Sequence, residues 1–350
     1  MLIKGENFSV LQELRQSYSG KVDLIYIDPP FSTNKTFTFG SDRANTISMG
    51  EDEGIAYADN LKGFDFIEFI RERLIAAREL LSDEGSIYLH TDYKVGHYIK
   101  IIMDEIFGID NFRNDITRIK CNPKNFYRKA YGNIKDMLLF YSKTKNLIWN
   151  DPKLPFNQTD KNILFKKIDK NGRAYTTIPL HAPGKTKNGA TAGYFKGLKP
   201  PDGRHWRCSP QELEKLDLAG LIEWSANGNP RKIIYADEKD GKKMQDIWEF
   251  KDYQYPVYPT EKNIELLKTI ISASSNSNSL VLDFFCGSGT TLIAAQELNR
   301  RWIGIDQSQQ AIKTVQMKLK SLPKTLFSNI DYAYLDAQTL DEKAVAKHIA

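Results

Sequence analysis

Residues 279–306 read SLVLDFFCGSGTTLIAAQELNRRWIGID, and this stretch determines the fold that the sequence predicts. It begins with a strand pattern at residues 279–284 and passes through the glycine-containing loop 286–289. It continues as a helical pattern at residues 290–299 and returns to a strand pattern at residues 302–305. A strand, a short glycine loop, a helix and a second strand are typical of α/β proteins. The stretch therefore predicts an α/β fold with a doubly wound, mostly parallel sheet.

The first and last thirds of the chain show the same alternation of apolar strand patterns with amphipathic helix patterns. We expect strands at residues 22–27, 86–90, 116–119 and 137–141, and helices at residues 61–81, 95–107, 260–274 and 309–319. The residues from about 32 to 60 are instead polar and rich in Gly, Ser, Thr and Asn. Loops of this length are often functional lids, so we expect this segment to be mobile until a substrate orders it.

The middle of the chain differs in composition from the two flanking thirds. About residues 150–250 carry scattered Gly, Pro, Lys and Asn, with one short helical pattern near residues 210–216. We therefore expect an irregular insertion or a small domain within the α/β pattern. The predicted division is residues 1–149, the insertion 150–250, residues 251–322 as the second half of the α/β domain, and an extension of unknown role at residues 323–350.

The charge of the chain is unevenly distributed. The net charge of the 350 residues is +5, but residues 118–205 hold 19 lysines and arginines against five aspartates and no glutamate. This segment therefore carries +14 and the remaining residues −9. Aromatic residues are interleaved with the cations. The asymmetry indicates a polyanionic partner, and a solvated basic surface without a partner is the alternative.

The remaining composition limits the class of protein. Hydrophobic residues make up 41% of the chain, which allows a sizeable core. No run of about 18 apolar residues occurs, so no membrane span is expected, and the first ten residues are too polar for a signal peptide. The three cysteines are widely spaced and form neither a zinc pattern nor a disulfide framework. We therefore expect a cytoplasmic protein without a metal site.

The loop that follows Asp283 is the first candidate ligand site. Its glycines let the backbone approach a ligand at the carboxyl end of a strand, and Asp306, at the end of the next strand, suits a ribose diol. Leu292 stands where the dinucleotide-binding fingerprint has its third glycine, which weakens a nicotinamide-cofactor interpretation. Residues 184–186, Gly-Lys-Thr, match the end of a phosphate-binding P-loop motif. The first glycine of that motif would fall at position 179, where this chain has proline, so the motif is absent. A tight structural turn is the alternative.

The second candidate site is Asp28-Pro29-Pro30-Phe31, directly after the predicted strand 22–27. Proline has no N–H, so the two prolines make the turn rigid and leave carbonyl oxygens free. Asp28 and the Pro29 carbonyl would accept hydrogen bonds from the NH2 group of a planar amine, and Phe31 would stack on its ring. A turn that merely ends the strand is the alternative for such a motif alone.

With these two motifs in this order, the sequence resembles the beta class of amino-group DNA methyltransferases, especially the adenine-N6 enzymes of bacterial restriction–modification systems. In this family the motif Asp-Pro-Pro-Tyr/Phe precedes the cofactor motif, and a target-recognition region lies between them. Residues 28–31 match the first motif, and residues 283–291 are similar to the second, with Phe284 where the family often has proline. The resemblance implies the circularly permuted methyltransferase fold.

Further matches extend the resemblance over about residues 2–319. Residues 2–7 resemble the segment whose acid contacts the adenine of the cofactor, with Glu where Asp is usual. Residues 258–263 resemble the Pro-Thr-Gln-Lys-Pro stretch beside the methionine end of the cofactor, with Glu and Asn as departures. Residues 304–306 match the ribose-binding segment. His90 and Asp92 lie in another family-like segment, where they would line the site, although a helix-capping role for Asp92 is equally consistent.

The resemblance implies S-adenosylmethionine as cofactor and site-specific methylation of N6 of an adenine flipped out of double-stranded DNA. The expected catalytic residues are Asp28, Pro29, Pro30 and Phe31. The expected cofactor contacts are Glu6, Asp28, Thr260, Lys262, Asp283, Phe284, Phe285, Cys286, Gly287, Gly289, Thr290 and Asp306. From the basic middle region we expect DNA contacts by Lys185, Lys187, Lys196, Lys199, Arg204 and Arg207. Trp206 and Trp224 are expected more as core residues than as stacking platforms.

Several alternatives remain at this stage. The same fold also methylates N4 of cytosine, but cytosine-N4 enzymes more often carry Ser where this chain has Asp28. Methylation of RNA or of a protein amide, and a DNA-binding specificity subunit without catalysis, are further alternatives. Methylation of carbon 5 of cytosine needs a nucleophilic cysteine that typically follows proline, whereas Lys120 precedes Cys121. A homodimer and a restriction endonuclease partner are suggested by the resemblance alone.

Overall fold

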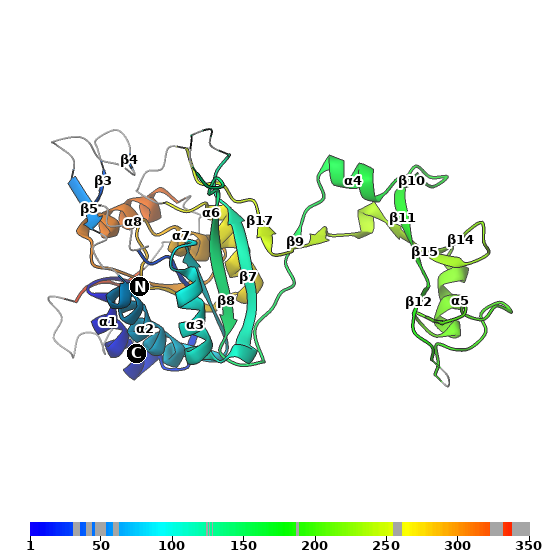
Figure 1. Cartoon of the computed structure of the whole chain (residues 1–350), viewed down its shortest axis with the longest axis horizontal. Coiled ribbons are helices and arrows are strands. Elements are labelled where there is room, and N and C mark those ends of the chain that lie inside the picture. Colours follow the sequence, from blue (N-terminus) through cyan, green and yellow to red (C-terminus); the bar gives the residue numbers. More distant parts are fainter. Residues whose placement is uncertain are drawn as a thin grey trace. The chain divides into compact units, whose positions relative to one another are not determined.

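The computed structural model divides the chain into two units (Figure 1). The first, which we call the α/β unit, combines Met1–Pro152 with Gln245–Ala350, and the second, the inserted unit, is Lys153–Met244. The structure describes residues 1–30, 36–39, 44–45, 54–58, 63–123, 125, 127, 129–186, 189–254, 261–322 and 332–337, with the backbone alone at 36–39, 44–45 and 54–58. The functional division of the chain drawn from the sequence stays a prediction.

A nine-stranded sheet forms the centre of the α/β unit, in the order β17-β7-β8-β6-β2-β18-β19-β1-β20. Strand β8 runs antiparallel to β6 and β7, and all other neighbours in the sheet are parallel. The predicted doubly wound, mostly parallel sheet is therefore confirmed. The strands are β1 (Leu2–Lys4), β2 (Val22–Ile27), β6 (Leu81–Thr91), β7 (Phe112–Ile119), β8 (Lys135–Ser142), β17 (Ile247–Trp248), β18 (Leu280–Asp283), β19 (Arg301–Asp306) and β20 (Tyr334–Asp336).

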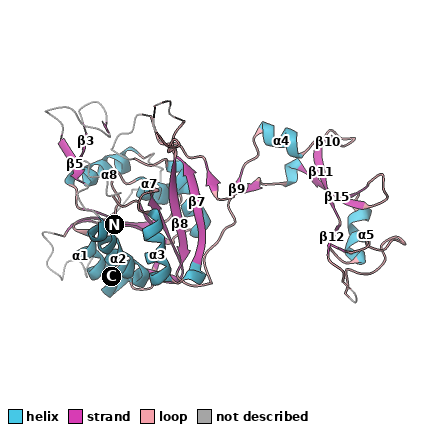
Figure 2. Ribbon diagram, in the orientation of Figure 1, coloured by secondary structure: helices cyan, strands magenta, loops and turns pink. Residues whose placement is uncertain are grey.

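Helices cover the sheet of the α/β unit (Figure 2). They are α1 (Asn7–Tyr18), α2 (Gly63–Leu80), α3 (Gly96–Phe107), α6 (Ile264–Ser274), α7 (Thr290–Glu297) and α8 (Gln309–Ser321), with a short 3-10 helix at Ile109–Asn111. Phe66, Ile70 and Leu74 of α2 recur every fourth residue and are buried in the main core, as an amphipathic helix requires. Helix α6 begins four residues later than predicted, because the Asn263 side chain caps it by accepting from a backbone N–H of its first turn.

The polar segment that the sequence predicts as a loop contains three short strands. These are β3 (Thr36–Phe39), β4 (Ala44–Asn45) and β5 (Gly54–Ala58), which form an antiparallel sheet in the order β4-β3-β5. The prediction of an unstructured loop is therefore wrong for these residues. Thr and Phe alternate in β3 and both favour strands, but the surrounding Gly, Ser and Asn concealed this short pattern.

The inserted unit is also more regular than predicted. It contains a four-stranded antiparallel sheet, β10-β11-β15-β14, and two strand pairs, β12-β13 and β16-β9. Its elements are β9 (Lys153–Leu154), α4 (Gln158–Leu164), β10 (Lys167–Ile168), β11 (Ala174–Pro179), β12 (His181–Pro183), β13 (Arg204–Trp206), α5 (Pro210–Leu218), β14 (Ile222–Trp224), β15 (Pro230–Tyr235), a 3-10 helix (Ala236–Glu238) and β16 (Lys242–Lys243). Strands of two to six residues are too short to show a clear period in the sequence.

The inserted unit has a small core of its own. Leu180, Phe195, Trp206 and Leu213 form this cluster, and the Trp206 indole donates a hydrogen bond to a backbone carbonyl at 2.9 Å. The prediction that Trp206 is a core residue is therefore confirmed. Trp224 stacks on Phe195 but keeps 39% of its surface exposed. Within the described residues of both units, none of the helices combines the length and apolar character needed to cross a membrane.

Candidate active site

The sheet topology brings the two sequence motifs to one edge of the α/β unit. Asp28 follows β2, Asp283 ends β18 and Asp306 ends β19. Strands β2, β18 and β19 are consecutive neighbours in the sheet and run parallel, so their carboxyl ends lie side by side. In doubly wound folds this edge is where ligands bind. We call it the carboxyl edge.

Asp28 presents an unusual pair of oxygens at the carboxyl edge. One, Oδ2, forms an ion pair with the Lys262 ammonium, and the two side chains are 17% and 10% exposed. The other, Oδ1, is buried and accepts no hydrogen bond within the described residues. A buried acceptor without a donor carries a desolvation cost of about 1–3 kcal/mol. An incoming donor group would remove this cost. Lys262, expected at the cofactor, here contacts Asp28.

The glycine loop is fixed by Asp306. The Asp306 carboxylate accepts hydrogen bonds from the backbone N–H groups of Gly287, at 2.9 Å, and Ser308, at 2.8 Å. Burial raises the pKa of this carboxyl. Gly289 has a φ of +75°, and a Cβ there would lie 2.7 Å from a Val315 methyl carbon. A larger residue therefore does not fit at this position, because its side chain would collide with α8 and the positive φ favours glycine.

Leu292, which stands where the dinucleotide-binding fingerprint has its third glycine, packs against a glycine on the neighbouring strand. A Cβ on Gly304 of β19 would lie 2.3 Å from the Leu292 side chain of α7. The close approach of helix and strand is therefore achieved by a glycine on the strand instead of one on the helix. This packing explains how the loop keeps its geometry without the dinucleotide pattern.

Asp283 forms hydrogen bonds with residues on both sides of the glycine loop. Its carboxylate accepts hydrogen bonds from the Phe285 N–H at 3.0 Å and from the Thr291 hydroxyl at 2.6 Å, and only 2% of the residue is exposed. Cys286 of this loop and Thr290, the first residue of α7, are buried, and burial raises the pKa of the Cys286 thiol well above its usual value. Cys286 therefore remains a protonated thiol that fills space.

Burial of Asp283 should make the stability of the protein depend on pH. Burial raises the pKa of this carboxyl to about 7, whereas an aspartate in an unfolded chain titrates near ~4. Between these values the folded protein binds the extra proton, so this contribution to the free energy of unfolding is full below about pH 4 and is lost as the pH rises to about 7. We expect Asp283→Asn to gain stability over wild type across this range, by at most about 1.4 kcal/mol per pH unit. Urea unfolding of both proteins at about pH 5, 6 and 7 measures the difference in their free energies of unfolding. A difference that does not vary with pH would contradict this assignment.

A polar chain links Glu6 to the glycine loop. Glu6 caps α1 by accepting hydrogen bonds from two backbone N–H groups of the first turn, and Arg73 of α2 donates to it at 2.5 Å. Arg73 also donates to Asn7 at 2.6 Å, and Asn7 donates to the Phe284 carbonyl at 2.9 Å. The Arg73 guanidinium lies 3.5 Å from the centroid of the Phe69 ring. Arg73, Asn7 and Phe69 were not among the residues predicted from the sequence, although the charged Arg73 interrupts the buried face of an amphipathic helix.

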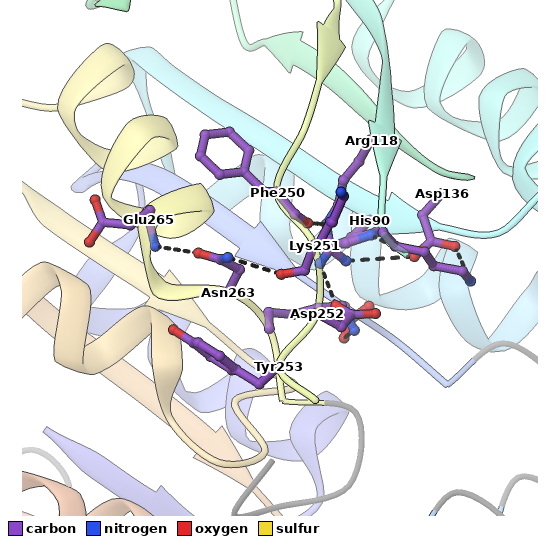
Figure 3. A network of polar contacts seen from close by, with 12 residues as sticks. His90, Arg118, Asp136, Phe250, Lys251, Asp252, Tyr253, Asn263 and Glu265 are labelled. Carbon is purple, nitrogen blue, oxygen red and sulfur yellow. Dashed lines mark hydrogen bonds and ion pairs between the residues drawn. The ribbon is translucent and has the colours of Figure 1, made fainter. Parts of the chain in front are cut away.

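A buried ionic network connects His90, Arg118 and Asp136 (Figure 3). In the β2–β6 pairing Ile27 is opposite Leu89, so Asp28, which follows β2, and His90 of β6 are the next residues along these adjacent strands. Tyr26 hydrogen-bonds His90 Nδ1 at 2.8 Å, and His90 Nε2 lies 3.4 Å from Asp136. Burial lowers the pKa of His90, so the neutral ring accepts from Tyr26 and directs its Nε2–H toward Asp136.

Two cations complete this network around Asp136. Lys120 contacts one carboxylate oxygen at 2.7 Å, and Arg118 lies 3.7 Å from the other. Burial alone would raise the pKa of Asp136, but the contacts with His90 and Lys120 hold it below its usual range. Arg118, which is 0% exposed, also donates to the Phe250 carbonyl at 2.7 Å and pairs with Asp252. The network therefore joins β6, β7 and β8 to the segment that returns to the α/β unit after Met244.

The other expected site residues are less informative or lie outside the described residues. The Asp92 carboxylate accepts from the N–H groups of Lys94 and Val95 in the turn before α3, but the N-cap of α3 is Val95 and has no side-chain cap, so Asp92 holds the turn and does not cap the helix. Pro29 is buried and Pro30 partly buried. Phe31, Lys187 and Thr260 lie outside the described residues. In the part of the chain that the structure describes, no cluster of three or more His, Cys, Asp or Glu side chains suits a metal ion.

The five described DNA-contact candidates all lie in the inserted unit. Lys185 pairs with Asp202 at 2.9 Å, and Lys196 pairs with Asp217. Lys199 lies 5.0 Å from the centroid of the Tyr194 ring. Arg204 contacts His181 at 3.2 Å, and Arg207 donates to the Pro179 carbonyl at 3.0 Å. The two lysines paired with carboxylates are therefore neutralised locally, whereas the two arginines contact neutral groups.

Comparison with known proteins identifies the class. The model of the N6/N4 DNA methylase family matches residues 22–317, so the chain belongs to this family of DNA methylases. S-adenosylmethionine is the cofactor of the family. A solved putative DNA modification methylase of Thermus thermophilus, complexed with S-adenosyl-L-methionine, is 13% identical with a TM-score of 0.50, covering 96% of this chain and 98% of that one. This likeness concerns the fold alone.

The chain is also similar in sequence to two curated proteins of restriction-modification systems. The type II methyltransferase M.EcaI of Enterobacter cloacae is 43% identical over 307 residues, which cover 85% of this chain and 64% of that protein. The StyLTI Mod subunit of Salmonella typhimurium, from a type III restriction-modification enzyme, is 28% identical over 336 residues, covering 85% of this chain and 50% of the subunit. The chain thus spans between half and about two thirds of the length of these relatives.

Proposed function

We propose that the chain is a site-specific DNA methyltransferase that transfers a methyl group from S-adenosylmethionine to N6 of an adenine in duplex DNA. The observation that carries the proposal is the carboxyl edge, where one buried oxygen of Asp28 accepts no hydrogen bond from the residues that the structure describes. The glycine loop and Asp306 lie at the same edge of the sheet. Membership of the DNA methylase family supports the choice of DNA as substrate.

The residues at the carboxyl edge fit the proposed cofactor. Each Asp306 oxygen accepts one backbone N–H and retains capacity to accept from a ribose hydroxyl. The loop is partly exposed at Gly287, and Glu6 caps the start of α1. When bound, S-adenosylmethionine supplies a methyl group that is already activated for transfer to nitrogen.

Replacing Asp306 should weaken cofactor binding. A hydrogen bond to a charged group contributes about 1.5–3 kcal/mol, so we expect Asp306→Ala to raise the Kd for S-adenosylmethionine at least about tenfold. Isothermal titration measures this constant, and circular dichroism checks that the variant is folded. Asp110→Ala, which removes an exposed acid from the short helix after α3, is the control. Equal Kd values for the two folded variants would refute the ribose role.

Asp28 would act by positioning the amino group of the base. Its Oδ1 and the Pro29 carbonyl would each accept one N–H, which turns the nitrogen lone pair toward the methyl donor. The Lys262 ammonium holds Oδ2, so the carboxylate has a fixed orientation and Oδ1 remains for the substrate. The amine need not be deprotonated first, because its proton leaves after the methyl group arrives. Phe31 would stack on the ring.

The base must leave the double helix to reach this edge, since its amino group is inaccessible inside the stack. Cytosine presents the same NH2 chemistry, and N4-cytosine methylation is the second candidate within this family. Asp at position 28, where cytosine-N4 enzymes more often have Ser, favours adenine. The inserted unit would read the DNA sequence, while a homodimer and an endonuclease partner stay predictions from the resemblance.

A transfer assay with labelled S-adenosylmethionine tests the proposed activity. Unmethylated bacterial DNA, total RNA and a protein extract are offered in separate reactions. We expect label in the DNA alone. Label in RNA or protein alone would replace DNA as the substrate, and DNA that is bound without being labelled would support a specificity subunit without catalysis.

A further inference from the structure

Two arginines of the inserted unit are held on the backbone of β11. Arg231 donates from Nε to the Thr177 hydroxyl at 2.8 Å and from Nη2 to the Thr177 carbonyl at 2.7 Å. Arg207 donates from Nε to the Pro179 carbonyl at 3.0 Å. Pro179 is the residue opposite Arg231 in the β11–β15 pairing, so both arginines lie beside the same end of β11. Glu223, opposite Arg231 on its other side, is bound to other partners.

A third arginine and a histidine continue this arrangement. His181 begins β12 just after β11, and Arg204 Nη1 lies 3.2 Å from its Nδ1. A guanidinium has no acceptor, so Nδ1 must accept this hydrogen bond and the proton of the neutral ring sits on Nε2. Burial, followed by the charges of Arg204, Arg207 and Arg231, lowers the pKa of His181. The four side chains therefore present donors and no free acceptor.

The charge of this cluster distinguishes it from the rest of the inserted unit. Arg173 is bound by Asp237 and Glu238, while Lys185 and Lys196 also pair with carboxylates. Arg204 and Arg207 instead contact an imidazole and a carbonyl, so these contacts do not cancel their positive charge, whereas the charge of Arg231 also acts on Glu223. Arg204 and Arg207 are exposed.

We propose that His181, Arg204, Arg207 and Arg231 form the point at which the inserted unit binds an acceptor-rich group of DNA. This inference rests on the proposed function. The ligand is either a backbone phosphate or the O6 and N7 edge of a guanine, which share the chemistry of closely spaced anionic or lone-pair acceptors. Arg207 is held by Nε, which leaves both terminal amino groups for a bidentate contact, and this preorganisation lowers the entropy lost on binding.

Binding selection from short duplexes of random sequence tests the site. Wild type, Arg207→Ala, Arg207→Lys and Arg204→Ala are each equilibrated with the pool at several salt concentrations, and the bound DNA is sequenced. We expect both alanine variants to bind at least about tenfold more weakly. Arg173→Ala removes the same charge from an arginine that carboxylates already occupy, and it should bind like wild type. Circular dichroism checks that every variant is folded.

The selected sequences distinguish the two ligands. If Arg207 contacts a guanine, its alanine variant loses the preference for guanine at one position. If it contacts a phosphate, the same sequence is enriched, the salt dependence falls by about one unit of slope, and Arg207→Lys restores most of the affinity. Arg204→Ala and Arg207→Ala that bind like Arg173→Ala would overturn the inference. A wild-type protein that binds no DNA would overturn the proposed function itself.

Discussion

Replacing Asp28 by alanine is expected to lower the rate of methyl transfer about 1,000-fold. The substitution removes the Oδ1 acceptor that would orient the amino group, and it also frees the Lys262 ammonium at the same place. The loss should appear in kcat, because the contact strengthens as the nitrogen attacks the methyl group. Single-turnover transfer of labelled methyl groups to DNA measures the effect.

An acid at the opposite end of the same strand provides the control for Asp28. The Asp23 carboxylate accepts from the Leu280 N–H at 2.9 Å and from the Ser82 hydroxyl at 3.2 Å, at the start of β2. Asp23→Asn keeps an acceptor there and should methylate DNA at close to the wild-type rate. An Asp28→Ala protein that keeps the rate of Asp23→Asn would show that this carboxylate does not act in transfer.

Replacing Arg118 by methionine is expected to destabilise the α/β unit by about 3–5 kcal/mol. Arg118 is fully buried, and its removal leaves Asp136 with less positive charge and the Phe250 carbonyl without its donor. Burying an uncompensated charge costs far more than losing a pair in water. Urea unfolding followed by circular dichroism measures the change in the free energy of unfolding.

A surface arginine provides the comparison for Arg118. Arg71 pairs with Glu68 and Glu105, which are 58% and 63% exposed. Exposed pairs contribute about 0–1 kcal/mol, so Arg71→Met should leave stability nearly unchanged. If the Arg118 and Arg71 variants lose the same stability, the buried network does not hold the return segment as described.

The carboxyl edge was predictable because it depends on local patterns. Asp28, Asp283 and Asp306 each follow an apolar run, and parallel strands necessarily place such residues at one edge. The strand and helix alternation gave the order of elements for the same reason. Element lengths were less predictable, as β6 and β7 extend well beyond their apolar centres.

Contacts between distant charged residues were not predictable from local patterns. Arg118 and Lys120 belong to the basic stretch for which the sequence predicts a polyanionic partner, yet both form ion pairs with Asp136 inside the α/β unit. Arg73 likewise lies on the buried face of α2, and its pairing with Glu6, which is distant in the sequence, was not predictable. Whether a charge faces water or a partner is decided by tertiary pairing, which one sequence does not display. The short strands of the inserted unit were not predicted for a different reason, because they are too short to show a measurable period in the sequence.

The most direct test of the account is the identity of the methylated nucleoside. DNA methylated by the protein is digested completely, and the nucleosides are separated and identified by mass spectrometry, with Asp28→Ala in parallel. We expect N6-methyladenine in the wild-type reaction and none in the variant reaction. N4-methylcytosine would contradict the assignment of adenine, and unmodified DNA after incubation with S-adenosylmethionine would contradict methyl transfer at the carboxyl edge.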